Sequence, residues 1–333
     1  MWNWMSELHK FLFDGMPVRG AIVRLTDAWA EVQRRRASNS ETGAYAPPVR
    51  ELLGEMLAAG VLMQSNIKFN GALVMQVHGD GPVKLAVAEV QSDLGLRATA
   101  SVQGEVPAQA RLAEMVNAGG AGRCAITLDP KERQPGQQPY QGVVPLQGVE
   151  GDKFQSLSQA LTFYMLQSEQ LDTTLVLAAN DQVAAGLMVQ RMPQQGEANL
   201  AGASGPGAGG DQNGHNEDYN RIAHLAGSLT RDELLTLDVD TILRRLFWEE
   251  KLLHFAPQQG TAGPRFACTC SRERVRNMLR SLGTEEVEGI LSERETVEVG
   301  CEFCGQQYRF DAVDAAQIFT GPAELAPGAK TVQ

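Results

Sequence analysis

The stretches Phe266-Ala-Cys-Thr-Cys-Ser-Arg-Glu-Arg274 and Cys301-Glu-Phe-Cys-Gly305 decide how this chain is organised. They hold four of the five cysteines, within the last fifth of 333 residues. Zn²⁺ takes four thiolate or imidazole ligands in a tetrahedron. Residues i and i+2 of an extended chain face the same side, so Cys268 and Cys270 are predicted to bind one metal from one strand. Cys301 and Cys304 have the two-residue spacing of a zinc knuckle.

The same spacing allows a second chemistry. In a fully extended chain the Cα atoms of Cys268 and Cys270 are about 6.5 Å apart, near the upper limit for a disulfide. A disulfide there requires the backbone to bend away from its metal-binding shape, and a strained disulfide is easily reduced again. Metal-bound and oxidised forms should therefore exclude each other. At this point both a passive structural zinc site and a redox switch remain open.

The composition argues against a membrane-spanning, a secreted or a nucleic-acid-binding protein. Hydrophobic residues make up 43% and charged residues 21%, and no apolar run is long enough to span a membrane. The first ten residues lack the apolar block of a signal peptide, which predicts a cytoplasmic protein, where clustered cysteines are usually metal or redox sites. The net charge of −11 opposes binding to nucleic acid or anionic lipid. The one basic cluster, Arg34–Arg36, is interpreted as a solvated helix end.

Hydrophobic periodicity predicts an α+β core, with mainly antiparallel sheets flanked by helices, rather than a doubly wound fold. Predicted strands cover 18–25, 72–78, 84–90, 96–102, 124–128, 141–146, 174–178 and 184–192. Predicted helices cover 6–16, 27–36, 48–65, 108–117, 152–169, 222–229, 231–237, 239–255, 271–282 and 284–291, the last with Thr284 as N-cap.

Residues 194–217 form a glycine-rich stretch of low complexity, which predicts a mobile loop. It contains Gly205-Pro-Gly-Ala-Gly-Gly210, a formal G-x-G-x-x-G. We reject a dinucleotide site because no strand precedes it, a proline lies inside it and no helix begins at its last glycine. In the following 239–255 helix, Ile242, Leu243, Leu246 and Phe247 are predicted to face inward. Either this helix packs permanently on the core, or the next domain must hold it in place.

From the cysteine motifs outward, the chain resembles the 33 kDa chaperonin family of redox-regulated heat-shock holdases. Further stretches that look like family signatures occur in the same order along most of the chain. They are Phe11-Leu-Phe-Asp, Val18-Arg-Gly, Gln76-Val-His-Gly-Asp-Gly-Pro82, Gln103-Gly-Glu-Val-Pro107, Tyr140-Gln-Gly-Val-Val144, Ser168-Glu-Gln170, Glu233-Leu-Leu-Thr-Leu237 and Leu246-Phe-Trp-Glu-Glu250. The glycine-rich insert and Cys124 fall outside the family pattern, and Cys124 is predicted to be a small buried strand residue.

The resemblance implies a core domain (1–193), the flexible insert (194–218), a helical linker (219–260), a zinc-binding redox-switch domain (261–320) and a tail (321–333). It implies one Zn²⁺ per reduced, inactive chain, held by Cys268, Cys270, Cys301 and Cys304. Oxidation would form the disulfides Cys268–Cys270 and Cys301–Cys304 and release the zinc. The oxidised chain would bind unfolded or partly folded client proteins without ATP in the stress response, and a homodimer is one assembly open to it.

The physics of a small metal domain agrees with these implications. About sixty residues bury too little apolar area to fold securely alone, whereas structural zinc contributes on the order of 10–16 kcal/mol in finger peptides. Losing the metal should therefore melt the domain. A linker helix that leans on this domain would lose cover for Ile242, Leu246 and Phe247. Arg265, Arg272, Arg274 and Arg276 are candidates to offset the −2 charge of a zinc tetrathiolate.

Two other classes remain as alternatives. A zinc-knuckle protein that binds nucleic acid should carry a basic stripe with aromatic residues, but this chain is acidic and only 6% aromatic. An enzyme with an accessory zinc knuckle should carry a catalytic motif, but the five histidines (9, 78, 215, 224 and 254) form no H-E-x-x-H. Four cysteine ligands also leave no open position for water on a zinc ion. The sequence therefore predicts a chaperone and not an enzyme.

Overall fold

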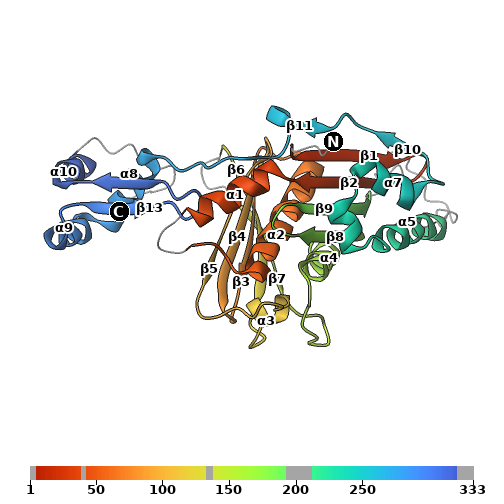
Figure 1. The fold of residues 1–333 in the computed structure, drawn as a ribbon, viewed down its shortest axis with the longest axis horizontal. Helices are drawn as coiled ribbons and strands as arrows, with labels where there is room; N and C mark the ends of the chain where they lie inside the picture. The colour runs from red at the N-terminus through yellow and green to blue at the C-terminus, as the bar shows by residue number, and fades with distance from the viewer. Residues whose placement is uncertain (1–4, 39–42, 133–137, 193–211, 321–333) are drawn as a thin grey trace, which may run out of the picture.

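The structure is a computed structural model that describes residues 5–38, 43–132, 138–192 and 212–320. Two β-sheets form the core, and a third, two-stranded sheet lies in a small C-terminal domain that projects from it (Figure 1). Among the described residues, β12 and β5 pair in parallel and the other strand pairs are antiparallel. The mainly antiparallel α+β prediction is confirmed.

The first sheet has the strand order β10-β1-β2-β9-β8, with β11 also paired to β1. Its strands are β1 (Glu7–Phe13), β2 (Val18–Leu25), β8 (Thr173–Ala179), β9 (Ala184–Arg191), β10 (Leu252–His254) and β11 (Gln258–Gln259). The second sheet has the order β12-β5-β4-β3-β6-β7. Its strands are β3 (Gly71–His78), β4 (Val83–Gln91), β5 (Gly95–Val102), β6 (Arg123–Pro130), β7 (Tyr140–Pro145) and β12 (Arg265–Phe266).

Helix α2 (Pro47–Asn66) lies between the two sheets and packs against strands of both (Figure 1). Its buried residues occur on every side of the helix, as expected for a helix enclosed by the core. The other core helices are α1 (Asp27–Ala37), α3 (Leu112–Val116) and α4 (Leu157–Gln167). The predicted helices at 108–117 and 152–169 are therefore shorter than expected, and α4 begins after its N-cap Ser156.

The predicted helix at 6–16 is wrong, because this segment forms strand β1. Phe11 and Phe13 lie on one face of the strand, two residues apart, and their rings meet edge to face with centroids 5.6 Å apart. The strand pairs with β2 through a short turn at Asp14–Met16. A short apolar run can fit both a helical and an alternating pattern, and here pairing with β2 decides for the strand.

The linker helices cover one face of the first sheet, as Figure 1 shows. They are α5 (Gln212–Gly227), α6 (Arg231–Thr236) and α7 (Val239–Phe247). The predicted helix at 239–255 is wrong beyond Phe247, where the chain turns and enters β10 opposite Phe13. Residues 194–211 of the predicted loop lie outside the described residues, and the prediction is wrong for 212–217, because α5 already begins at Gln212.

The inward-facing residues of α7 pack on the core sheet. Ile242, Leu243, Leu246 and Phe247 are buried in a cluster with residues of β1, β2, β8 and β9. The described members of that cluster include no residue beyond Leu252. Of the two alternatives left open by the sequence, the described contacts therefore favour packing of this helix on the core. Buried Arg24 of β2 also binds this segment by donating to the carbonyls of Leu234, Leu235 and Leu237 at 3.2, 2.8 and 3.0 Å.

The C-terminal domain has a small apolar core of its own, formed by Leu279, Val287, Val297, Phe310, Ala315 and Ile318. Its elements are α8 (Arg272–Leu282), α9 (Thr284–Glu293), β13 (Val297–Gly300), β14 (Gln307–Phe310) and α10 (Ala312–Thr320). Gly283, with φ of 98°, occupies the N-cap of α9 in place of the predicted Thr284. So small a core is consistent with a domain that needs a metal to stay folded.

Candidate metal centre

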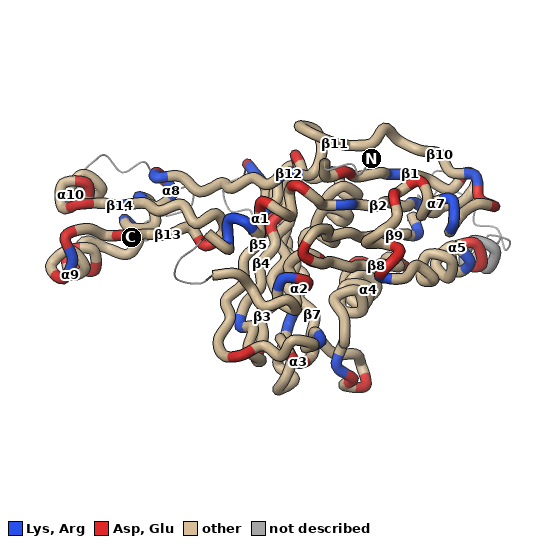
Figure 2. Tube along the Cα trace, in the orientation of Figure 1, with Lys and Arg blue, Asp and Glu red and all other residues tan. Residues whose placement is uncertain are grey.

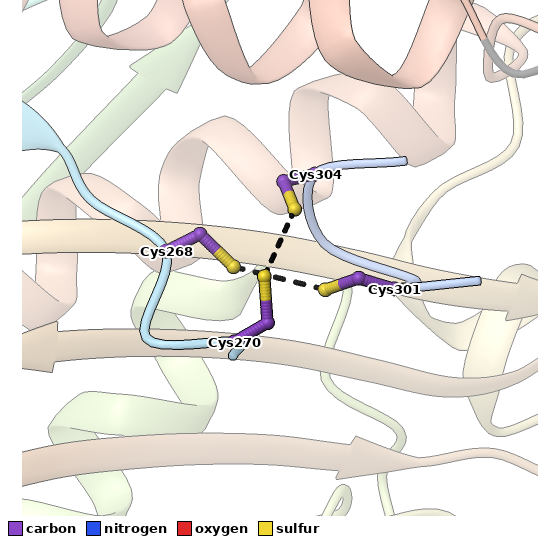
Figure 3. A group of neighbouring side chains, drawn as sticks. All are labelled: Cys268, Cys270, Cys301 and Cys304. Atoms are coloured by element: carbon purple, nitrogen blue, oxygen red, sulfur yellow. Dashed lines mark hydrogen bonds between the residues drawn. The ribbon is translucent and has the colours of Figure 1, made fainter. Parts of the chain in front are cut away.

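The sulfur atoms of Cys268, Cys270, Cys301 and Cys304 all lie within 4.8 Å of one another (Figure 3). Cys268 and Cys270 come from the segment that follows β12, and Cys301 and Cys304 from the turn that follows β13. Cys304 is buried and the other three are half-buried. The predicted tetrad is thus brought together in one place from two segments of the chain.

Local backbone geometry explains how each pair is held. The Cys301–Cys304 turn closes through hydrogen bonds from the Gly305 N–H to the Cys301 carbonyl at 2.8 Å and from the Cys301 N–H to the Gln306 carbonyl at 2.9 Å. Gly305 has φ of 71°, a conformation that favours glycine. Strand β12 ends at Phe266, so Cys268 and Cys270 lie on irregular backbone and not on the single strand predicted for them.

The four sulfurs fit a zinc ion. A Zn–S distance of about 2.3 Å in a tetrahedron places neighbouring sulfurs about 3.8 Å apart. The Sγ atoms of Cys268 and Cys301 are 3.7 Å apart, and those of Cys270 and Cys304 are 3.3 Å apart. The donor set is all sulfur, which suits zinc or an iron–sulfur centre and not magnesium or calcium. These distances belong to one shared site and do not select a disulfide pairing.

Arg97 of β5 is a site residue that sequence reasoning missed. Its Nη1 atom lies 3.6 Å from the Cys268 sulfur, and its guanidinium lies over the Phe303 ring, 4.2 Å from the centroid. Arg97 and Cys268 are 171 positions apart in the chain. The contact arises because β12 pairs with β5 and places the cysteine segment beside Arg97. No local sequence pattern signals such a contact.

The arginines predicted to offset the charge of the cluster lie elsewhere. Arg265 forms an ion pair with Asp93, and Arg272 forms one with Asp314 at 2.8 Å. Arg274 donates to the Thr269 hydroxyl at 2.6 Å and thus supports the loop between the first two cysteines. Arg276 lies close enough to Asp314 to lower the pKa of that carboxyl, after the stronger effect of Arg272. Among the described residues, the guanidinium within hydrogen-bonding distance of a cysteine sulfur is that of Arg97.

The environment makes the thiols unequal in the absence of a metal. Burial by itself raises the pKa of the Cys268 thiol, but the Cys270 backbone N–H and the Arg97 guanidinium outweigh it and lower the pKa to about 7. Burial raises the pKa of both Cys301 and Cys304. Cys268 therefore becomes the thiolate, the form that binds metals and reacts with oxidants, more readily than Cys301 or Cys304.

The basic cluster at Arg34–Arg36 is more engaged than a solvated helix end. Arg34 and Arg35 both bind Glu31 at 2.7 Å. Arg35 also lies over the Phe266 ring of β12, 5.3 Å from the centroid, and Arg36 lies over the Tyr45 ring at 4.0 Å. The end of α1 therefore contacts the segment that leads into the cysteine site. Across the described residues, basic and acidic positions are interspersed, and Figure 2 shows no continuous basic stripe in this view.

Comparison with known proteins shows which family this chain belongs to. The family model described as Hsp33 protein matches residues 6–311. This chain belongs to the Hsp33 family. It is 43% identical to the 33 kDa chaperonin of Chromobacterium violaceum, with 95% of each chain covered. It is 42% identical to the 33 kDa chaperonin of Methylobacillus flagellatus, covering 95% of this chain and 94% of the relative.

A solved structure shows the same fold. The Hsp33 homologue from Thermotoga maritima, a 33 kDa chaperonin, superposes with a TM-score of 0.69 at 21% identity, covering 95% of this chain and 98% of the other. Within this Hsp33 chain, Cys124 is fully buried on β6, as predicted, and burial raises its pKa to about 12. Among the described helices, none has the length and apolar character needed to cross a bilayer.

Proposed function

We propose that this protein is a redox-regulated, ATP-independent chaperone that binds unfolding proteins under oxidative stress. Membership of the Hsp33 family supports the chaperone role, and the curated relatives are named chaperonins. The observation that carries the redox part is the convergence of four thiols within 4.8 Å of one another. The proposed partners are unfolded or partly folded clients, the proposed location is the cytoplasm, and no enzymatic step is proposed.

In the proposed resting form, Cys268, Cys270, Cys301 and Cys304 hold one Zn²⁺ per chain. The bound ion would stabilise a domain whose own buried core comprises six described residues. We propose that peroxide converts Cys268–Cys270 and Cys301–Cys304 into disulfides. For each disulfide, two thiolates give up two electrons, which together with two protons from the solvent convert one hydrogen peroxide into two waters. The sulfurs then no longer serve as thiolate ligands.

The contacts indicate how this change would reach the linker. The chain from Leu252 to Phe266 runs from β10 through β11 to β12, which pair with β1 and β5. Helix α7 precedes this segment in the chain. The segment leads into the C-terminal domain at Cys268. Melting of the C-terminal domain frees one end of the segment and weakens its pairing. We propose that α7 then loosens from β1 and exposes Phe247 together with Phe11 and Phe13.

The proposed units are a core (1–193), the insert (194–218), the linker (219–260), the redox-switch domain (261–320) and the tail (321–333). In the described structure the linker includes β10 and β11 as well as helices. This mixed composition supports the proposed role, because short edge pairings to β1 are weak enough to open locally.

The test is suppression of aggregation of a chemically denatured client, measured without nucleotide. The reduced zinc-loaded protein should be inactive, and the peroxide-treated protein at raised temperature should suppress aggregation. A variant with serine at all four cysteines removes the redox step while leaving Cys124 in place. Equal activity of reduced and oxidised wild type would refute the redox regulation, and activity in neither form would refute the chaperone role.

A further inference from the structure

Arg97 makes three contacts at once, two of which reach the metal centre. On the core side, its Nη2 and Nε atoms donate to Glu89 Oε2 of β4 at 2.6 and 3.1 Å. Glu89 and Arg97 are directly opposite each other in the β4–β5 pairing. On the other side lie the Cys268 sulfur at 3.6 Å and the Phe303 ring at 4.2 Å. One side chain of the core thus contacts both halves of the cysteine site.

The Arg97 guanidinium is held in place by the core. The Arg97 and Glu89 side chains are each 13% exposed, and Gln91 donates to the other Glu89 oxygen at 2.6 Å. A buried arginine that donates twice to a carboxylate has little freedom to reorient. Because these contacts lie within the second sheet, the guanidinium is oriented by the core and not by the cysteine segment.

The charge and shape of the site suit this cation. Four metal-bound thiolates give a divalent zinc site a net charge of −2. A guanidinium beside Cys268 offsets part of that charge at the first cysteine pair. Phe303 lies between Cys301 and Cys304, so a cation on its ring face contacts the turn that carries the second pair.

We propose that Arg97 is a positioning residue of the metal centre, which docks the C-terminal domain on the core by contacting Cys268 and Phe303. The effect of this contact on redox regulation, described next, rests on the proposed function. When two thiolates become a disulfide, their two electrons and two protons from the solvent convert one hydrogen peroxide into two waters, and the sulfur carries no negative charge. Arg97 then keeps its pair with Glu89 and loses its anionic partner. Oxidation thereby weakens docking directly, in addition to melting the domain.

The same interface offers a local reporter of docking. Beside Arg97, the Arg265 N–H donates to the Leu94 carbonyl at 3.2 Å and the Ala267 N–H donates to the Leu96 carbonyl at 3.0 Å. It also offers a matched control, because the Arg265 side chain binds Asp93 across the same interface. That ion pair is more exposed, with Arg265 at 37% and Asp93 at 63%.

The experiment uses the full-length, reduced, zinc-loaded protein and measures zinc transfer to a chromophoric chelator together with hydrogen exchange of the Arg265 and Ala267 amides. Substitution of groups that support metal ligands typically costs about 10–100-fold in metal affinity. We expect a loss of that size for Arg97→Met, with faster exchange of both amides, and a smaller loss for Arg97→Lys. Arg265→Met should change zinc affinity by less than about threefold.

Because Arg97→Met removes the cation that pairs with the half-buried Glu89 carboxylate, the double variant E89Q/R97M is measured as well. Its strands β3 to β6 should retain wild-type exchange, while its zinc affinity falls as in the single variant. Unchanged zinc affinity in the double variant, or an equal loss in Arg265→Met, would overturn the proposal. The zinc and exchange measurements require no client, so they test Arg97 independently of the chaperone proposal. That proposal fails if the oxidised wild-type protein does not suppress aggregation.

Discussion

The Phe247 ring of α7 lies edge-on against the Phe13 ring of β1, with centroids 5.0 Å apart and planes at 89°. Phe11 completes the contact, with its centroid 6.1 Å from that of Phe247. All three rings are at most 2% exposed. The apolar face of the linker is therefore covered by the first strand of the core. In the proposed mechanism, this aromatic contact is the interface that opens before the linker binds a client.

The first prediction concerns Phe247→Ala. Removing a buried phenylalanine ring costs about 3–5 kcal/mol. Because Phe247 belongs to the linker, we expect this loss of stability to loosen α5–α7, which would be seen as faster hydrogen exchange there. The loosened protein should also suppress client aggregation before any oxidant is added. Trp248→Ala is the matched control, since the neighbouring Trp248 is 74% exposed. An equal effect of both substitutions, or an open linker without client binding, would contradict the prediction.

The second prediction concerns pH. Glu55 of α2 faces Arg231 of α6 at 3.8 Å beside a cavity of about 470 Å³, and its side chain is 18% exposed. Burial raises the pKa of Glu55 to about 8, against the pull of Arg231. The folded protein therefore holds this proton more tightly than the unfolded chain does. The resulting stability is fully present below about pH 4.5 and is lost as the pH rises through about 8.

Glu55→Gln should remove this dependence, so that the variant gains on the order of 2–4 kcal/mol relative to wild type between pH 5 and 9. Urea unfolding across that range measures the gain. Glu51→Gln is the control, because Glu51 binds the same arginine at 2.9 Å and is more exposed, at 38%. A parallel pH profile for wild type and Glu55→Gln would show that Glu55 does not titrate in this range.

The third prediction separates the two buried cysteines. Cys304→Ala removes a ligand of the proposed zinc site, so we expect zinc to be lost and α8–α10 to exchange as an unfolded segment, with the core strands unaffected. Cys124→Ala, on β6, should retain one zinc per chain, because Cys124 lies in the core away from the other thiols. Zinc content and exchange are measured on the same samples. Retention of zinc by Cys304→Ala would remove it from the ligand set.

The grouping of the four cysteines could be predicted from the sequence because each pair is recognised by its short spacing, Cys268 with Cys270 and Cys301 with Cys304. The strand of 18–25 and the helices of 27–36 and 48–65 were likewise local and are confirmed. The strand β1 was missed because Leu8, Phe11 and Leu12 fit a helical stripe while Phe11 and Phe13 fit an alternating one. Only the pairing with β2 decides between them.

The remaining errors have a related cause. Helix α7 ends at Phe247, but the apolar Leu252, Leu253 and Phe255 continue the helical pattern past the point where pairing with β1 takes over. Arg97 was missed because its contact with Cys268 depends on two residues of β12 pairing with β5. Such contacts join parts of the chain that are far apart in sequence, and a single sequence carries no local trace of them.

The central claim is that one chemical event at the four thiols both releases zinc and produces chaperone activity. The most direct measurement follows zinc with a chromophoric chelator while peroxide is added at raised temperature, and scores suppression of client aggregation on the same samples. The account predicts that about one zinc per chain leaves as suppression appears, and that thiol reductant with zinc reverses both. Release of zinc without suppression would contradict it, and would leave the cysteine cluster as a structural support only.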